Sequence, residues 1–219
     1  MSDNRRPRLW VVWAMVGLVL CAAAAGFGIA RATGAESEKL PVASAADTGF
    51  SRDMAVHHQQ AVEMSFLVRD NTADEDVRRL AFDVINTQAN QRGMMLGWLD
   101  MWQAPKVTSE GAMGWMEGHS AGMAQTEMPG MATRAQLEQL RTAKGKAAEV
   151  LYFQLMIPHH QGGVQMAEAA VKQAKGPQVK ALAEGIVRAQ QSEITLMQDM
   201  LAKRGAKPGA TASPSSGHH

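Results

Sequence analysis

Tyr152-Phe-Gln-Leu-Met-Ile-Pro-His-His-Gln-Gly-Gly-Val-Gln-Met166 repeats an earlier stretch of this 219-residue chain, Phe50-Ser-Arg-Asp-Met-Ala-Val-His-His-Gln-Gln-Ala-Val-Glu-Met64. A constant offset of 102 residues (159 minus 57) aligns the two His-His-Gln segments and the methionines on either side of them. The same offset aligns Val77, Leu80, Gln88 and Met95 with Val179, Leu182, Gln190 and Met197. Because the register holds without a gap, the sequence predicts two copies of one structural unit, which form the two halves of one domain.

Each copy reads as a pair of helices joined by a short turn. The predicted helices span about 47–71 and 73–102 in the first copy, and about 134–174 and 176–204 in the second. Lys175-Gly176-Pro177 supplies a glycine stop followed by a proline start. Four amphipathic helices on one core predict an all-α, up-and-down four-helix bundle over residues 49–205, with a Met-rich connection at 106–133. Pro158 is expected to kink or restart its helix just before the second histidine pair.

The N-terminus carries features of an export signal. Arg5, Arg6 and Arg8 precede an uncharged apolar run at 9–30, which is long enough to cross a bilayer as a helix. We therefore expect residues 1–33 to be a membrane anchor or a signal sequence that places the folded domain outside the cytoplasm, with secretion after cleavage as the alternative. Residues 34–48 read as a linker, and 206–219 as a disordered tail.

Composition excludes several kinds of partner and site. Lys plus Arg total 22 against 21 for Asp plus Glu, so the chain has no basic excess that would indicate nucleic-acid binding. The single cysteine, Cys21, lies in the apolar N-terminal run. The folded part therefore has no disulfide and no cysteine-based metal site, and any metal ion must be held by His, Met, carboxylate or amide groups.

Helical spacing places the repeated motif on one stripe of its helix. Met54, His57, Ala61 and Met64 fall on one face, and adjacent histidines differ by about 100° around the axis, so one of each pair is expected to point deeper. The second helix of each unit offers a matching stripe, Gln88, Gln91 and Met95 or Gln190, Glu193 and Met197. The candidate metal ligands on the helices are therefore Met54, His57, His58, Met64, Met156, His159, His160, Met166, Glu193 and Met197.

An ordinary structural role is the alternative for each of these residues. Methionine is an adaptable filler of cores, and a lone histidine in an apolar stripe is usually a hydrogen-bonded core residue. Gln59, Gln161, Gln88 and Gln190 are expected to hold histidine tautomers rather than to bind metal. The occurrence of His-His at equivalent positions in both copies favours a metal site for the pairs.

The Met-rich connection has its own soft donors, separated by glycines and small residues. Its candidate ligands are Met113, Met116, His119, Met123, Met128 and Met131. The glycines and small residues predict that this segment is mobile. Thioethers select Cu(I), and imidazole binds either oxidation state of copper, so the segment is also expected to collect copper, with Cu(I) favoured and Cu(II) as an alternative. A hydrophobic lid over the bundle is the competing interpretation.

These motifs resemble those of the domain of unknown function family 305, a group of bacterial exported proteins. The resemblance rests on the two His-His segments, the Met128-Pro-Gly-Met131 step and Gln190-Gln-Ser-Glu-Ile-Thr-Leu-Met197. It implies a ferritin-like four-helix bundle and, for some members, copper binding outside the cytoplasm. The chain departs from the pattern at Leu155, where an acidic residue is common, and its two halves differ where Gln91 stands in place of Glu193.

Three classes of function follow. The first is a membrane-anchored or secreted envelope protein that binds copper, sequesters it or passes it on, with an envelope copper-handling protein or a second copy of the chain as its partner. The second is a non-catalytic interaction module with structural His and Gln networks. The third is a ferritin-like di-metal oxidase, a chemistry that uses Glu-x-x-His pairs. No Glu-x-x-His occurs in this sequence, so we expect no enzymatic activity.

Overall fold

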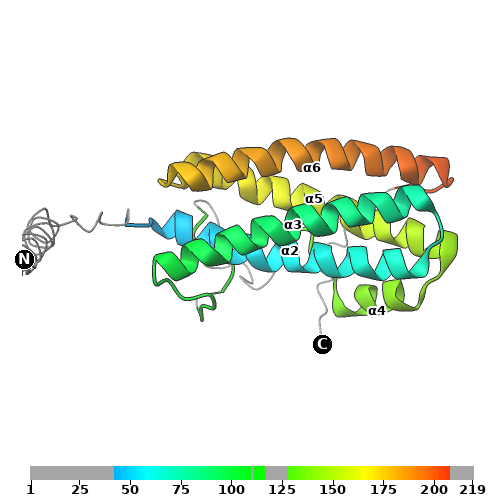
Figure 1. The fold of residues 1–219 in the computed structure, drawn as a ribbon, viewed down its shortest axis with the longest axis horizontal. Coiled ribbons are helices and arrows are strands. Elements are labelled where there is room, and N and C mark those ends of the chain that lie inside the picture. Colours follow the sequence, from blue (N-terminus) through cyan, green and yellow to red (C-terminus); the bar gives the residue numbers. More distant parts are fainter. Residues whose placement is uncertain (1–41, 110, 117–127, 208–219) are drawn as a thin grey trace, which may run out of the picture. The chain divides into compact units, whose positions relative to one another are not determined.

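The computed structural model describes residues 42–109, 111–116 and 128–207 (Figure 1). The predicted anchor or signal sequence at 1–33, most of the predicted linker, His119, Met123 and the tail beyond residue 207 lie outside the described residues. Among the described helices, none combines the length and the apolar character needed to span a bilayer.

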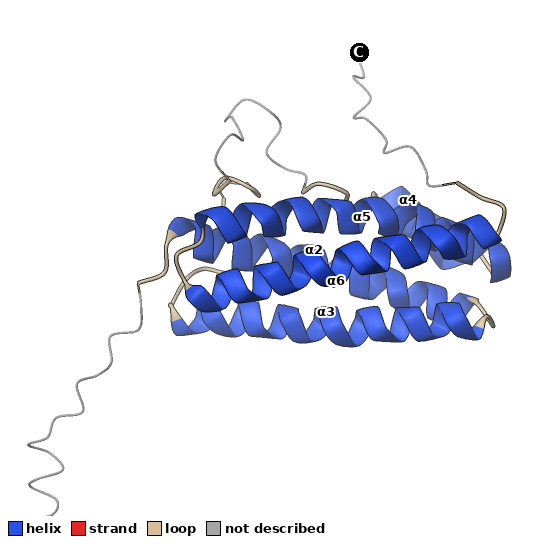
Figure 2. Ribbon diagram, turned by 90° about the horizontal axis from the view of Figure 1, so that it is seen from above, coloured by secondary structure: helices blue, strands red, loops and turns tan. Residues whose placement is uncertain are grey.

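The described residues form five α-helices and no strand (Figure 2). They are α2 (Ala45–Asn71), α3 (Glu75–Met101), α4 (Arg134–Thr142), α5 (Gly145–Gln173) and α6 (Pro177–Lys203). The all-α prediction is therefore confirmed. The single helix expected over 134–174 is in fact two, because Ala143 and Lys144 are extended and Gly145 has a φ of 53°. Of the kink or restart expected at Pro158, the restart does not occur, since α5 continues through that residue.

Local sequence signals fix where the helices begin. The Ser44 hydroxyl accepts from the Asp47 N–H while the Asp47 carboxylate accepts from the Ser44 N–H, which is a complete capping box. The Asp74 carboxylate caps the first turn of α3 through the backbone N–H groups of Asp76 and Val77. These short polar side chains satisfy backbone donors that have no partner within the helix.

Contacts between helix ends define the topology. The end of α5 meets the start of α2, where the backbone N–H groups of Lys175 and Gly176 donate to Asp47 Oδ1 at 3.1 and 2.9 Å. The end of α6 meets the start of α3, where Arg204 donates to Asp74 at 2.7 Å. Helices α2 and α5 are therefore antiparallel, as are α3 and α6, and the chain runs up, down, down, up (Figure 1).

The expected up-and-down order was therefore wrong. After α3, Pro129 and Ala132 contact the middle of α2, α4 ends beside Asn71 at the end of α2, and α5 begins from that end of the bundle (Figure 1). The physical reason is the repeat itself. A helical hairpin whose inner face complements a copy of itself pairs with that copy about a two-fold axis, as in an isologous dimer, and this turns the second hairpin end over end.

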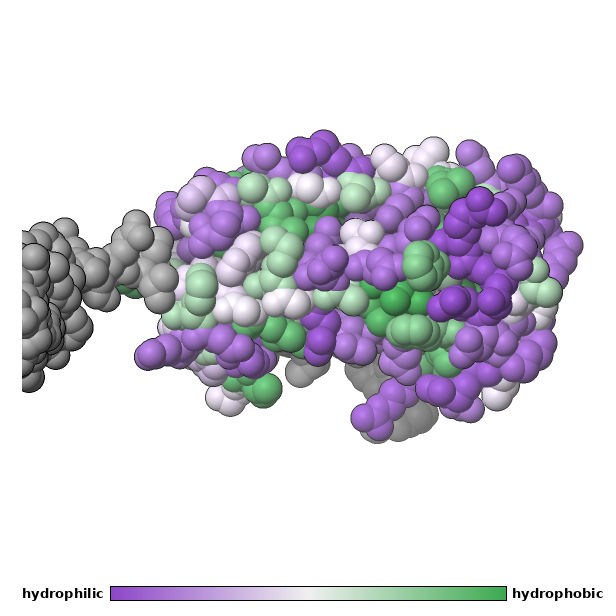
Figure 3. Space-filling view, viewed as in Figure 1, coloured by the Kyte–Doolittle hydropathy of each residue, from purple (hydrophilic) through white to green (hydrophobic). Residues whose placement is uncertain are grey.

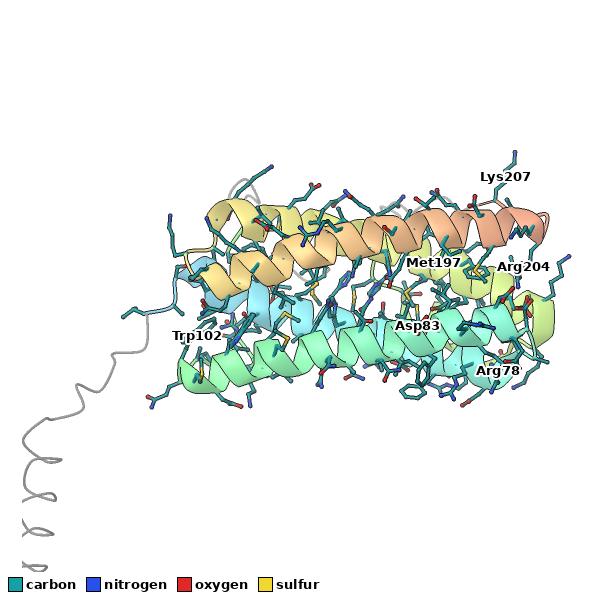
Figure 4. The ribbon with its side chains drawn as sticks, turned by 45° about the horizontal axis from the view of Figure 1, so that its top comes forward. Arg78, Asp83, Trp102, Met197, Arg204 and Lys207 are labelled. Atoms are coloured by element: carbon teal, nitrogen blue, oxygen red, sulfur yellow. The ribbon has the colours of Figure 1, made fainter. Side chains whose placement is uncertain are left out.

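The core has two apolar parts, one toward each end of the bundle. One part contains Tyr152 and Phe153 together with buried residues of α3 and α6. The other contains Phe50 and receives Ala112 and Trp115 from the connection. Figure 4 shows Met197 of α6 directed between the helices, and Trp102 and Arg204 at opposite ends of the bundle. The face seen in Figure 3 is mainly hydrophilic, with apolar side chains in small patches, as on most soluble domains.

The end of the bundle that carries Arg204 is closed by a buried charge network. Glu149 is 7% exposed and accepts from Arg204 Nε at 2.6 Å and from the Thr72 hydroxyl. Arg204 also donates to Asp74 at 2.7 Å. Because each charge has a partner of opposite sign, the network links the start of α3, the start of α5 and the end of α6 without leaving a buried charge unpaired.

Candidate metal centre

Four histidines meet in the middle of the bundle, between the two apolar parts of the core. His57 and His58 of α2 and His159 and His160 of α5 are all completely buried. The imidazoles of His57 and His159 stack with their centroids 3.8 Å apart and their planes tilted by 32°. The repeat therefore brings both histidine pairs into one layer. Exposure does not single out one member of each pair as deeper, but their contacts differ: His57 and His159 meet each other, whereas His58 contacts α3 and His160 contacts α6.

Hydrogen bonds assign the protons of three of these rings. His57 Nε2 lies 3.1 Å from the Pro129 carbonyl oxygen, and His160 Nε2 lies 2.8 Å from Glu193 Oε2. His58 Nε2 lies 2.8 Å from Gln91 Oε1. Each of these oxygens is an acceptor, so each Nε2 carries the proton and Nδ1 keeps its lone pair. An imidazole that donates through one nitrogen and presents the other as a free lone pair is the form that binds metal ions in proteins.

Burial keeps the imidazoles of His57, His58 and His159 neutral. Loss of hydration lowers the pKa of His57 to about 4, with the Pro129 hydrogen bond acting in the opposite direction. Burial and the neighbouring His57 lower the pKa of His58 to about 3. Burial and the adjacent imidazoles hold the pKa of His159 well below its usual value. At neutral pH these rings are therefore available as ligands rather than blocked by a proton.

The layer contains many polar atoms that lack a hydrogen-bond partner in the protein. They are Nδ1 of His57, His58 and His160, both ring nitrogens of His159, and both amide atoms of Gln88 and Gln190. Gln88 and Gln190 are each 2% exposed and occupy equivalent positions of the repeat. Four ring nitrogens and the two amide oxygens of this set carry lone pairs that are available to a ligand that accepts electron pairs, whereas the two amide nitrogens and the protonated nitrogen of His159 are hydrogen-bond donors.

The expected role of Gln59, Gln161, Gln88 and Gln190 as hydrogen-bond partners of the histidines was wrong. Both amide atoms of Gln88 and of Gln190 lack a partner in the protein. Gln59 and Gln161 are exposed. The partners that orient the rings are instead Gln91 and Glu193, one helix away. Sequence spacing could have found them, because they are related by the same 102-residue offset as the histidines that they contact.

Six buried methionines flank the histidine layer in two symmetric groups. One group is Met54, Met95 and Met166, and the other is Met64, Met156 and Met197. All six are completely buried. The 102-residue offset maps each group onto the other, so each half of the core has the same three thioethers. Met95, which was not among the candidate ligands, is the equivalent of Met197 and belongs with them.

The start of the Met-rich connection is fixed to α2 by a carboxylate. Asp53 is 5% exposed and accepts from the backbone N–H of Met113 at 2.7 Å and from the indole N–H of Trp115 at 2.9 Å. Burial raises the pKa of Asp53. Met113 is buried, while Met116 and Met128 are partly buried, and all three pack against the core part that holds Met54. The described part of the connection is thus docked on the bundle, as the lid interpretation expects.

The end of the connection lies directly over the histidines. Besides the Pro129–His57 contact, Gln60 exchanges two hydrogen bonds with the Ala132 backbone, at 2.9 and 2.7 Å. A Cβ atom on Gly162 would lie 1.9 Å from the Pro129 carbonyl oxygen, so only glycine permits this approach. Gly130 has a φ of 77° and is similarly close to the backbone of α5. Met131 is half-buried at this turn and belongs to neither methionine group.

No carboxylate-rich site accompanies this layer. Across residues 42–109, 111–116 and 128–207, no three His, Cys, Asp or Glu side chains converge on a point where they could hold one ion. Glu193 is the one carboxylate among those residues that is hydrogen-bonded to the central histidines. The donor set is therefore imidazole nitrogen and thioether sulfur, which suits soft ions of low coordination number better than hard divalent ions.

The fold and this layer define a helical bundle built from two repeated hairpins, with a buried histidine layer between two methionine groups. The family model described as "Domain of unknown function (DUF305)" matches residues 47–201. The chain belongs to this family. A comparison with the curated proteins found no match.

Solved structures of similar proteins agree with this assignment. A DUF305 protein from Streptomyces coelicolor, described as a candidate secreted protein, is 56% identical, with a TM-score of 0.70 over 77% of this chain and 98% of that one. A DUF305 fragment from Deinococcus radiodurans is 31% identical, with a TM-score of 0.62 over 74% and 99% of the two chains. CopM in its Cu(II)-bound form is 25% identical, with a TM-score of 0.56 over 72% and 96%, and CopM has also been solved in a Cu(I)-bound form.

Proposed function

We propose that this chain is a non-catalytic copper-binding protein of the cell envelope, which sequesters copper or passes it on through His and Met ligands. The observation that carries the proposal is the histidine layer, in which imidazoles without a hydrogen-bond partner on Nδ1 lie between two groups of three buried thioethers. Copper is the cargo in this proposal. Cu(I) is the favoured state because thioethers are soft donors and because two or three such donors satisfy it.

The comparisons support the proposal at two levels. CopM, whose fold the chain shares at 25% identity, has been solved with Cu(I) and with Cu(II). The description of the Streptomyces coelicolor protein as a candidate secreted protein supports a place outside the cytoplasm. The single long crossover between the two hairpins supports a ferritin-like connectivity, in which metal sites are built between facing helices of the bundle core.

The structure also bears on the two alternatives. A purely structural His and Gln network would satisfy its own hydrogen bonds, because a partly satisfied polar network is worse for stability than an apolar core. Within the protein, neither amide atom of Gln88 or Gln190 and only one nitrogen each of His57, His58 and His160 is paired, which favours a ligand-binding layer over a self-contained network. A di-metal oxidase needs several inward carboxylates. The buried carboxylates have other roles here: Asp47 caps helix ends, Asp53 holds the connection, and Glu149 pairs with Arg204.

The test is a titration of the purified full-length chain, in mild detergent, with Cu(I) against a competing chelator, followed by Cu(II) and Zn(II). We expect tight Cu(I) binding and weak Zn(II) binding. Replacing His57, His58, His159 and His160 together with glutamine should abolish the tight Cu(I) sites, and the matched control replaces the exposed Gln59 and Gln161 with alanine. Unchanged Cu(I) affinity in the four-histidine variant, or no competition by any ion in the unmodified chain, would disprove the proposal.

A further inference from the structure

The two halves of the histidine layer have the same geometry but differ in one functional group. In the first half, His58 Nε2 lies 2.8 Å from Gln91 Oε1. In the second half, His160 Nε2 lies 2.8 Å from Glu193 Oε2. The 102-residue offset relates both pairs, and both imidazoles have an unpaired Nδ1. Equivalent histidines in one core therefore donate from Nε2 to an amide oxygen in one half and to a carboxylate oxygen in the other.

We propose that Glu193 makes the two halves unequal, so that a soft monovalent cation binds first and more tightly on the His160 side. This inference rests on the copper-binding function proposed above. A carboxylate that accepts the Nε2 proton raises the electron density of the ring, makes Nδ1 a stronger donor and compensates the positive charge that the ring receives from the ion. The neutral amide oxygen of Gln91 accepts the same hydrogen bond without supplying a charge.

The surroundings of Glu193 allow it to act in this way. Its side chain is 21% exposed, whereas the His160 side chain is completely buried. The carboxylate therefore keeps contact with water, which lowers the free-energy cost of its negative charge. Its hydrogen bond to Nε2 raises the electron density at Nδ1 of the buried imidazole. One carboxylate matches one monovalent ion such as Cu(I) or Ag(I). A divalent ion would leave one positive charge uncompensated in the same apolar surroundings.

Glu193 is a positioning residue in this proposal, and two isosteric substitutions separate its charge from its shape. Glu193→Gln keeps the hydrogen bond, as Gln91 already demonstrates in the other half, and removes only the charge. Gln91→Glu adds the missing charge to the His58 side. Loss of such a partner typically lowers metal affinity by about 10- to 100-fold. Glu193→Gln should therefore weaken the first binding step by this factor and make the two halves alike.

The experiment titrates the full-length chain with Ag(I), a redox-inert soft cation, and follows the imidazole nitrogen signals of isotope-labelled histidine by NMR. In the unmodified chain the His160 signals should shift before those of His58. Glu193→Gln should abolish this order, and Gln91→Glu should bring the His58 step forward. Simultaneous shifts of both rings in the unmodified chain, or an order that Glu193→Gln leaves intact, would overturn the inference.

Two controls keep the outcomes distinct. Thermal unfolding of the metal-free variants reports whether each substitution preserves the fold. If Glu193→Gln does not fold, the Gln91→Glu variant decides the question. In that variant, His58 signals that still shift at a higher Ag(I) concentration than those of His160, as in the unmodified chain, overturn the inference. Absence of any Ag(I) or Cu(I) binding to the unmodified chain would instead remove the proposed function on which the inference rests.

Discussion

Acidification should destabilise the metal-free protein well above the pH at which carboxylates titrate. His57, His58 and His159 have their pKa lowered by burial, to about 4, to about 3 and well below the usual value, respectively. In the unfolded chain the same side chains recover a pKa of about 6.5. Between these limits the unfolded state binds more protons than the folded state, so stability falls as pH falls.

The size of the effect follows from linkage. Between about pH 7.5 and pH 5.5, one histidine with an unfolded pKa of about 6.5 and a folded pKa near 4 or below contributes roughly 1 to 2 kcal/mol, so His57 and His58 together contribute about 3 kcal/mol. The lowered pKa of His159 adds to the effect in the same direction. This is a large share of a typical domain stability of about 5–15 kcal/mol. The window lies above the usual range of carboxylate titration, and the raised pKa of Asp53 works in the opposite direction at its lower edge.

Urea unfolding followed by far-UV circular dichroism, on metal-free protein at several pH values across this window, measures the effect. The free energy of unfolding should fall steadily as the pH falls, and at the lower end of the window unfolding should take up about one proton for each of the desolvated rings. His57→Gln should remove about a third of the pH dependence, because one of the three groups is lost. A free energy of unfolding that is the same at both ends of the window would refute the argument that these imidazoles are desolvated in the metal-free core.

Two further substitutions test the packing around the layer. Gly162→Ala places a Cβ 1.9 Å from a backbone oxygen of the connection and should lower stability by about 1–3 kcal/mol in thermal unfolding, whereas Gly185→Ala, with no atom within 4 Å, should be neutral or stabilising. A harmless Gly162→Ala would mean that the connection does not dock as described. Arg204→Ala leaves Glu149 buried without its cation and should cost about 3–5 kcal/mol in urea unfolding. The exposed Arg141, removed in the same way, should cost less than about 1 kcal/mol, and equal effects would contradict the buried network.

The helices and the inward stripes were predictable because local chemistry encodes them. The capping residue Asp74 and the Gly176-Pro177 step mark helix starts directly in the sequence. Met54, His57 and their equivalents follow helical spacing, and the structure buries all of them. The orientation of one hairpin against the other has no such local signal. The length of the segment between Trp102 and Arg134 was the available hint, because such a segment is long enough to return along the bundle.

The partners of the histidines were harder to predict than the histidines themselves. Gln59 follows the motif directly in sequence, yet it lies on the outer face of α2 and is exposed. Pro129 accepts from His57 across 72 residues of chain, through a backbone oxygen that has no sequence signature. The sequence identifies Asp53 only as an acidic residue before Met54. Its hydrogen bond with the Met113 backbone forms because the connection docks on the bundle. Contacts between loops and helices therefore cannot be predicted from helical periodicity, whereas contacts between helices of the repeat could be predicted from the 102-residue offset.

The energetics of the layer bear directly on its role. An unpaired buried polar atom costs about 1–3 kcal/mol, so the unpaired ring and amide atoms of this layer oppose folding by a sizeable amount in the metal-free protein. The methionine groups on either side show that the same bundle packs a fully apolar core where it can. The lone pairs that the protein itself leaves unpaired in this layer are available to a bound ion. Binding of an ion to the folded state alone offsets this cost by mass action, by an amount that grows with the logarithm of the ratio of the ion concentration to its dissociation constant. The copper-binding function proposed above would in this way couple the stability of the bundle to the supply of the ion.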